Sequence, residues 1–417
     1  MLRYQRAGER FGMNFRMNDV TPSSPPVPDC LPAPMPFSPE RRLMLAGMLT
    51  LCVAACSGAG LPGFEQTPAV PAVGAGGVKI ALILPLSAGG QTGIAANSLK
   101  NAGELAIAEA NAPNVQLIVK DDKGTSDGAS AAAQEAVNEG AELIVGPLIA
   151  ANVQAAAAVA RAAGRPVIAF SSDASVASRG VYLLSFMPAT DVQRVVSYAA
   201  AQGKHSFAAL VPDTPYGQVT GGAFQEAVTR AGARVTALEH YGPDHNQMID
   251  TAKRLAPALQ EADALFIPDG ADTLPGILEA LATSGVDLKR LKLIGTGVWN
   301  DPKLFRLPQM QGSWFPAPEP SGFAAFAQRY RARYNSEPSR IASLSYDALS
   351  LAAALVRTQG SQRFSETVLT NPSGFAGADG LFRFHPDGTS DRGLAVLEIR
   401  NGSAVTVSPA PKSFAGS

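Results

Sequence analysis

The sequence predicts an α/β protein made of two successive Rossmann-like lobes, each with a parallel sheet. Three features lead to this prediction. From Val78 onward, apolar runs of strand length alternate with helix-length segments, and this cycle restarts after residue 186. The end of the chain departs from this alternation, because two consecutive helical stretches precede short strands. Regular alternation of strand and helix is typical of parallel sheets with right-handed crossovers.

Residues 1–55 are predicted to be an N-terminal extension and a lipoprotein signal peptide. Arg41 and Arg42 precede an apolar run, 43–55, that ends in small residues. A charged region before a short apolar run is typical of a secretory signal, and this run is shorter than the roughly 20 residues that span a bilayer. Translation from Met35 would give a leader of ordinary length.

The segment 53–56 (VAAC) resembles a bacterial lipobox, in which the cysteine is acylated and becomes the first mature residue. Cys56 is therefore the predicted lipidation site, and its acyl chains would hold the protein at a membrane. Residues 56–77 are rich in Gly, Ala and Pro, which predicts a flexible tether. We expect a lipid-anchored periplasmic protein, with the outer membrane favoured because Ser57 and not Asp follows the cysteine.

The first lobe begins with an apolar run, 78–84, of the kind found in strands that are buried on both faces. Gly140 and Gly164 fit the ends of two later helices, where a left-handed residue is favoured. The predicted strands are 78–84, 115–120, 143–145, 166–170 and 181–186, and the predicted helices are 93–110, 127–140 and a segment ending at 164.

The second lobe repeats the cycle and ends differently. Asp387-Gly388 fits a turn between two short strands near the end of the chain. The predicted strands are 207–211, 234–239, 264–267, 291–294, 381–384 and 394–399, and the predicted late helices are 322–334 and 343–358.

Ligands of open parallel sheets bind beyond the carboxyl ends of the strands. The loops expected there are rich in Ser, Gly, Asp and Asn, and several precede a predicted helix. Helix N-termini and hydroxyl groups suit a carboxylate ligand. The loops are 85–92, 146–152, 171–175, 212–217, 268–272 and 295–300.

Composition and motifs argue against several other functions. A formal net charge of −1 and a pI of about 6.5 argue against nucleic-acid binding. All three cysteines lie within the first 56 residues, and the four histidines are not at metal-ligand spacing. The sequence has neither a Gly-x-Ser-x-Gly elbow nor a phosphate-loop signature. We therefore predict no enzymatic activity, no cofactor and no metal.

Motifs along the chain resemble those of the Leu/Ile/Val-binding proteins, which have the type I periplasmic-binding fold. The motifs occur in family order from about Val78 to the C-terminus. They are 84–87 (LPLS), 144–147 (IVGP), 188–193 (PATDVQ), 213–217 (DTPYG) and 346–348 (YDA). The resemblance implies three crossovers, near Met187, Pro316 and Ser373. It divides the chain into lobe I, 78–188 plus 317–372, and lobe II, 189–316 plus 373–410.

The resemblance also implies a function without catalysis. A small polar ligand, such as an amino acid or a small amide, would close the two lobes over itself. The closed form would then dock on an ABC permease.

The candidate ligand-binding residues come from the resemblance and from the expected loops. Ser87 and Tyr216 match ligand-contacting positions of the family, and Asp269 is the candidate acceptor for an α-ammonium group. The chain departs from the family at Ala150 and Ala151, where a serine is usual. The serines of the 171–175 loop are added for their hydroxyl groups, and Trp299 is added because its indole could form one wall of the cleft. The full set is Ser87, Ser171, Ser172, Ser175, Tyr216, Asp269 and Trp299.

Five of these candidates also have a purely structural interpretation. Ser171, Ser172 and Asp269 could cap helices, and Tyr216 and Trp299 could pack in the hinge or the core. These alternatives stay open at the level of sequence.

A second resemblance involves the tail. The segments 379–384 (DGLFRF), 387–389 (DGT) and 392–396 (RGLAV) resemble the tail of lipoproteins that activate penicillin-binding proteins. That resemblance implies contact with a peptidoglycan synthase instead of a permease.

Overall fold

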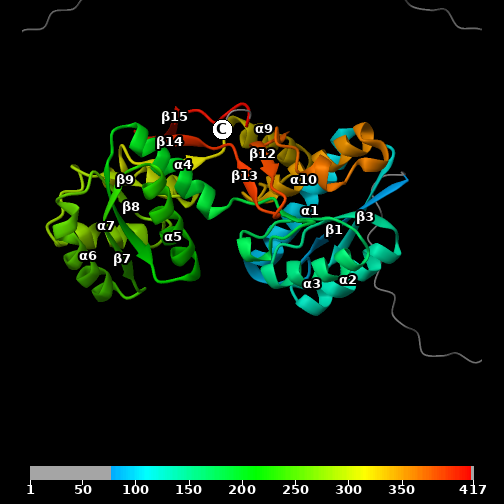
Figure 1. Ribbon diagram of the computed structural model, residues 1–417, viewed down its shortest axis with the longest axis horizontal. Helices are drawn as coiled ribbons and strands as arrows, with labels where there is room; N and C mark the ends of the chain where they lie inside the picture. The colour runs from blue at the N-terminus through cyan, green and yellow to red at the C-terminus, as the bar shows by residue number, and fades with distance from the viewer. Residues whose placement is uncertain (1–76, 415–417) are drawn as a thin grey trace, which may run out of the picture. The chain divides into compact units, whose positions relative to one another are not determined.

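A computed structural model describes residues 77–414 and shows two sheets flanked by helices, together with a small third sheet (Figure 1). The predicted leader and tether, with Cys56, lie outside the described residues. In the part of the chain from 77 to 414, no helix is long and apolar enough to cross a membrane.

Lobe I is built on a five-stranded parallel sheet in the order β2-β1-β3-β4-β5. Strand β1, which lies between β2 and β3, has six of its seven residues buried because helices cover both faces of the sheet. The strands are β1 (Val78–Leu84), β2 (Val115–Asp121), β3 (Ala141–Val145), β4 (Val167–Ala169) and β5 (Val181–Leu183). The helices are α1 (Gly90–Ala110), α2 (Ser126–Asn138), α3 (Ala150–Ala162) and η1 (Ala174–Val176).

Later helices return to lobe I and complete it. Helix α10 (Ala342–Thr358) packs against α1, and Gly103 permits the close approach because a Cβ there would lie 2.5 Å from Leu349 Cδ1. Helix α9 (Pro320–Tyr334) packs on α1 through Phe326 and Tyr330. The short helices η4 (Gly360–Gln362) and α11 (Glu366–Leu369) follow.

Lobe II is built on a seven-stranded mixed sheet in the order β15-β14-β10-β9-β8-β6-β7. Strands β6 to β10 are parallel, and the last two strands run antiparallel to their neighbours. The strands are β6 (Ser206–Pro212), β7 (Arg234–Tyr241), β8 (Ala264–Phe266), β9 (Lys292–Ile294), β10 (Trp314–Ala317), β14 (Ala395–Arg400) and β15 (Ser403–Ser408). The helices are α4 (Pro188–Ala201), α5 (Pro215–Arg230), α6 (His245–Leu259), α7 (Leu274–Thr283), η2 (Gly297–Trp299), α8 (Pro302–Phe305) and η3 (Pro308–Met310).

The small third sheet belongs with lobe I, which differs from the predicted boundary. It consists of β11 (Phe375–Gly377), β12 (Gly380–Phe384) and β13 (Ser390–Arg392). Phe382 and Phe384 lie in the same apolar cluster as the strands of lobe I, and the Phe384 ring is 5.4 Å from that of Tyr182. Only the residues from β14 onward, and not all of 373–410, join the sheet of lobe II.

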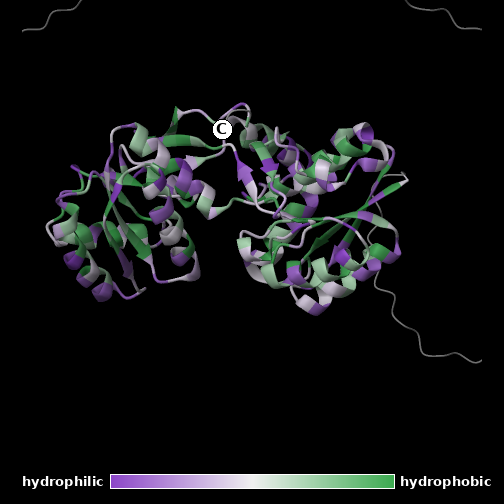
Figure 2. Ribbon diagram, viewed as in Figure 1, coloured by the Kyte–Doolittle hydropathy of each residue, from purple (hydrophilic) through white to green (hydrophobic). Residues whose placement is uncertain are grey.

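The chain passes between the lobes three times, as the fold class predicts. The crossovers are 184–187, 318–319 and 393–394, and the third of them lies away from Ser373, near which the resemblance implies it. Most strands of both sheets are hydrophobic, and the outward turns of the helices are more hydrophilic (Figure 2). The crossovers therefore connect the apolar clusters of lobe I with separate apolar clusters of lobe II.

Candidate functional site

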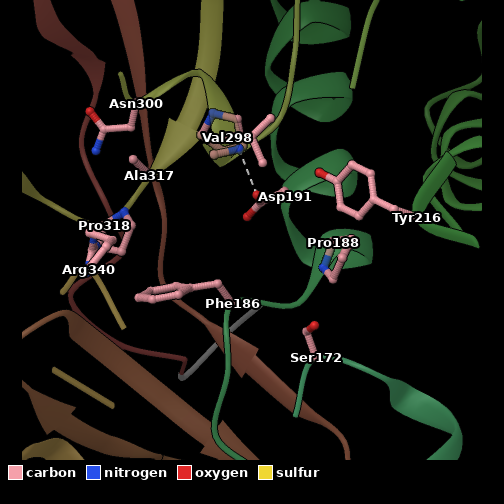
Figure 3. A pocket seen from close by; sticks show the side chains of 12 residues that line it. Ser172, Phe186, Pro188, Asp191, Tyr216, Val298, Asn300, Ala317, Pro318 and Arg340 are labelled. Carbon is pink, nitrogen blue, oxygen red and sulfur yellow. Dashed lines mark hydrogen bonds between the residues drawn. The ribbon is translucent and has the colours of Figure 1, made fainter. Parts of the chain in front are cut away.

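A cavity of about 300 Å³ lies at the crossovers and is lined by both lobes (Figure 3). Lobe I contributes Ser172 and Arg340, and lobe II contributes most of the remaining wall. The lining residues are Ser172, Phe186, Pro188, Asp191, Tyr216, Gly297, Val298, Asn300, Pro316, Ala317, Pro318 and Arg340. We call this space the interlobe cavity.

Strand ends position much of the wall. Ser172 follows β4, Tyr216 lies in the first turn of α5 after β6, and Gly297 follows β9. Thr214 fixes the start of α5 because its Oγ1 accepts a hydrogen bond from the Gly217 N–H at 3.1 Å. This is the ligand-binding edge of an open parallel sheet.

Asp191 is the acidic group of the interlobe cavity, and the sequence analysis did not select it. It lies in the first turn of α4, and its Oδ2 accepts a hydrogen bond from the Gly297 N–H at 2.8 Å (Figure 3). Burial raises its pKa to about 7, although that hydrogen bond and the charges of Arg392 and Arg340 favour the carboxylate. The group therefore changes charge near neutral pH.

Arg340 is the basic group of the cavity and was also missed. It makes a two-pronged ion pair with the fully buried Asp379, with N–O distances of 2.7 and 3.0 Å. Its guanidinium lies over the rings of Phe186 and Phe323, at 4.6 and 4.4 Å from their centroids. These contacts hold the cation in one place, and its side chain is still 36% exposed.

A second, deeper ion pair lies behind this wall. Arg392 is 7% exposed, and its Nη1 is 3.8 Å from Oδ2 of Asp347, which is 1% exposed. Burial raises the pKa of Asp347 to about 6 against the opposing effect of Arg392. The Arg392 guanidinium lies 5.0 Å from the centroid of the Phe186 ring, so one ring contacts both arginines.

Tyr216 and Ser172 are the two predicted residues that line the interlobe cavity. The Tyr216 hydroxyl is 2.8 Å from the Thr296 hydroxyl, and burial raises its pKa to about 12. It is therefore a neutral hydrogen-bonding group at physiological pH.

The other predicted serines do not line this cavity. Ser171 is buried, and its Oγ accepts a hydrogen bond from the Asp173 N–H at 3.2 Å. Ser175 is exposed, and its N–H donates to Asp173 at 2.9 Å. Ser87 is exposed, and its N–H donates to Asp121 Oδ1 at 3.3 Å. Asp173, and not Ser171, caps the short helix η1, and the contact of Ser171 is a local turn contact with the Asp173 N–H.

Asp269 and Trp299 also lie away from the interlobe cavity. Asp269 lines an adjoining cavity of about 500 Å³ within lobe II, where it accepts a hydrogen bond from the Tyr241 hydroxyl. Trp299 is completely buried, and its Nε1 donates to the Asp269 carbonyl oxygen at 3.0 Å. The indole is a core residue of lobe II and not part of the cavity wall.

The chemistry of the interlobe cavity suits a small molecule with a carboxylate. Arg340 offers a fixed cation, Asp191 offers a titratable acceptor, and Ser172, Tyr216 and Asn300 offer neutral polar groups. Phe186, Val298 and the prolines provide apolar wall. Residues 77–414 contain no cluster of His, Cys, Asp and Glu that could hold a metal ion.

Comparisons with known proteins agree with this arrangement. The family described as periplasmic binding protein matches residues 77–404. No curated protein matches the chain.

Solved structures with a similar fold cover about four fifths of the chain. A putative branched-chain amino acid ABC transporter protein from Rhodospirillum rubrum has 20% identity and a TM-score of 0.71, covering 79% of this chain and 99% of its own. A substrate-binding protein from Desulfitobacterium hafniense in complex with Leu has 18% identity and a TM-score of 0.60, covering 79% and 99%. A solute-binding protein from Rhodopseudomonas palustris in complex with 3,4-dihydroxybenzoic acid has 23% identity and a TM-score of 0.58, covering 80% and 96%.

Proposed function

The chain belongs to the periplasmic binding protein family, and from this membership we propose that it captures a small carboxylate-bearing molecule for an ABC permease. One observation carries the proposal. The interlobe cavity is lined by residues of both lobes at the crossovers, and it places the fixed cation Arg340 in the same wall as the acidic Asp191. An amino acid or a small amide carrying a carboxylate fits this pair of groups, and family membership implies a periplasmic location.

The proposed mechanism is a shift between open and closed arrangements of the lobes. A ligand in the interlobe cavity contacts both lobes at once, so it binds the closed arrangement more tightly and increases its population. The role is binding without chemistry, so a ligand recovered from the complex should be unchanged. Docking of the closed form on a permease would then release the ligand for transport.

The first experiment is a thermal-unfolding screen of the purified protein with amino acids, small amides and aromatic carboxylates. A ligand at 100 times its dissociation constant stabilises the folded state by about 2.7 kcal/mol. A ligand that raises the unfolding temperature by several degrees supports capture and names the ligand class. A folded protein that responds to no member of these classes contradicts the proposal.

A variant pair tests whether the ligand uses the interlobe cavity. Arg340→Gln removes the cation of the cavity, and we expect ligand affinity to fall at least tenfold because the carboxylate loses a charged donor. Arg306→Gln is the matched control, since Arg306 is exposed and outside this cavity. Equal affinities of the two variants, measured by isothermal titration calorimetry, would place the ligand elsewhere.

Lipid anchoring at Cys56 is a further part of the proposed function. The lipobox resemblance and the tether 56–77 support it. Cys56→Ser should move the protein from the membrane fraction to the periplasmic extract, and should abolish incorporation of labelled palmitate. Unchanged membrane association of Cys56→Ser contradicts anchoring at this residue. Extraction with the outer-membrane fraction would support that membrane over the inner one.

A second candidate function is a scaffold that activates a penicillin-binding protein. The scarcity of hydroxyl groups on the lobe I wall favours it. Ser172 is the one serine of lobe I that lines the interlobe cavity, and Ala150 and Ala151 stand where the family usually has a serine. This candidate predicts co-purification with a peptidoglycan synthase and no response in the ligand screen.

A further inference from the structure

The adjoining cavity of about 500 Å³ within lobe II has an acidic wall, and we call it the lobe II cavity. Asp213, directly after β6, and Asp269, after β8, both line it. The described residues that form its wall include no lysine, arginine or histidine. A ligand group that enters this cavity therefore meets two carboxylates and no cation of the protein.

Neither carboxylate of the lobe II cavity forms an ion pair with a described residue. Asp269 accepts hydrogen bonds from the Tyr241 hydroxyl and from the Gly270 N–H. Both of these donors are neutral, so they leave the negative charge of Asp269 without a counter-charge. Asp213 is exposed, and its side chain has no hydrogen-bond partner among the described residues. Both groups are therefore available to a cation.

The acidic character continues into the interlobe cavity. Asp191 lines that cavity and forms no ion pair with a described residue. One of its oxygens accepts the hydrogen bond from Gly297, and the other is directed toward the space between the labelled residues (Figure 3). Arg340, the cation of this cavity, is already held at two contacts by Asp379. The walls of the two cavities therefore combine three carboxylates with one cation that has a carboxylate of its own.

The two cavities adjoin, because Tyr216 and Val298 line both of them. Burial raises the pKa of the Tyr216 hydroxyl, and the charges of Asp191 and Asp269 raise it further. Both carboxylates are thus near enough to act on the same hydroxyl. Val298 is 44% exposed, and it offers an apolar surface to the methylene chain of a ligand at this junction. One ligand can therefore extend from the interlobe cavity into the lobe II cavity.

We propose that the captured molecule carries two cationic groups, one bound in each cavity, and that it is a dibasic amino acid. This inference rests on the proposed function, because it names the class of molecule that the protein captures. The α-ammonium group binds at Asp191, and the side-chain cation binds at Asp269 and Asp213. The carboxylate contacts Ser172 and Arg340 near the crossovers. A cation that leaves water needs a carboxylate partner, and a guanidinium matches a carboxylate with two hydrogen bonds.

Isothermal titration calorimetry with two pairs of probes tests the ligand class. L-Arginine and L-citrulline have the same length, but citrulline has a neutral ureido group in place of the guanidinium. L-Lysine and L-norleucine differ by the terminal ammonium group. We expect the cationic member of at least one pair to bind at least tenfold more tightly than its neutral partner, because a charged donor forms the stronger hydrogen bonds.

The same titrations separate this inference from the proposed function. Equal affinities within both pairs, or no binding of any of the four probes, overturn the inference. If the thermal-unfolding screen still finds another ligand, the proposed function stands and only the dibasic class is wrong. A protein that responds to neither the probes nor the screen contradicts both.

A matched pair of substitutions locates the side-chain cation. Asp269→Asn removes one negative charge from the lobe II cavity and keeps an oxygen that accepts a hydrogen bond. Asp272→Asn is the control in the same loop, because the Asp272 side chain is 92% exposed and lies outside both cavities. We expect the affinity for the cationic probe to fall at least tenfold in Asp269→Asn and less than twofold in Asp272→Asn. Equal affinities of these two variants would overturn the assignment of Asp269.

A second variant of the lobe II cavity does not depend on a buried contact. Asp213→Asn changes an exposed side chain without a hydrogen-bond partner, so folding is not at risk, and it decides the question if Asp269→Asn fails to fold. We expect the affinity for the cationic probe to fall about threefold, in line with a solvent-screened pair. The neutral partner of that probe should bind as it does to the wild type. Unchanged affinity for the cationic probe in Asp213→Asn would overturn the role of this residue.

Discussion

Replacing Asp347 by Asn should remove a pH dependence from the stability of the protein. Asp347 lies on α10 with 1% of its surface exposed. Its Oδ1 accepts a hydrogen bond from the Ala378 N–H at 2.6 Å, and an amide oxygen can accept the same bond. Burial raises the pKa of this carboxyl to about 6, so the folded state favours its neutral form.

The sign of the effect follows from proton linkage. Between the ordinary pKa of 3.8 and the folded-state pKa of about 6, the folded chain binds more protons at Asp347 than the unfolded chain does. The stabilisation that Asp347 contributes is therefore complete below pH 3.8 and is lost as the pH rises through about 6. The loss totals about 3 kcal/mol, of which about 2 kcal/mol falls between pH 4.5 and 7.5.

An Asn side chain resembles the neutral carboxyl and has no charged form, so the variant does not lose this stability as the pH rises. We expect the stability of Asp347→Asn relative to that of the wild type to rise by about 2 kcal/mol from pH 4.5 to pH 7.5. Urea unfolding followed by far-ultraviolet circular dichroism at the two pH values measures both differences. Asp250→Asn, at an exposed carboxyl of α6, is the control for the loss of one negative charge. Parallel pH profiles for Asp347→Asn and the wild type would refute the reasoning.

Two further predictions concern the interlobe cavity and the lobe II core. Asp191, with a pKa of about 7, loses its charge as pH falls, so affinity for an amine-bearing ligand should drop about tenfold from pH 8 to pH 6. Asp191→Asn should remove that dependence, and titration calorimetry that shows the same slope in both proteins would contradict the assignment. Gly295→Ala places a Cβ 2.2 Å from the Trp299 ring and should cost about 1–3 kcal/mol. An unchanged thermal unfolding temperature would show that the indole moves aside freely.

Local sequence patterns predicted the lobes because each strand carries its own signal. The run Val78–Leu84 is apolar except for Lys79, and the structure buries its other six residues in a parallel sheet. The small third sheet is harder to predict, because β11 and β13 have three residues each and carry no apolar run. That sheet belongs to lobe I because Phe382 and Phe384 pack on strands that are distant in the sequence. A local sequence pattern cannot predict such a contact.

The site was predicted less fully, for a related reason. The loops after β4, β6 and β9 were expected, and Ser172 and Tyr216 lie in two of them. Asp191 and Arg340 instead belong to the crossover side of the cavity, in the first turn of α4 and before α10. An acidic residue in a first helical turn is usually explained by the helix dipole. Only the cavity shows that this carboxyl also faces Gly297 of another loop.

The charged groups at the crossovers share one aromatic contact. Phe186 lies in the first crossover and contacts the guanidinium groups of both Arg340 and Arg392. Arg340 is held by Asp379, which comes just before β12, and Arg392 ends β13 at the third crossover. Arg340 is therefore tied directly to the first crossover through Phe186 and to the small third sheet through Asp379. Buried charged networks have few alternative arrangements because each unpaired member is costly, so these contacts restrict how the first and third crossovers can be arranged.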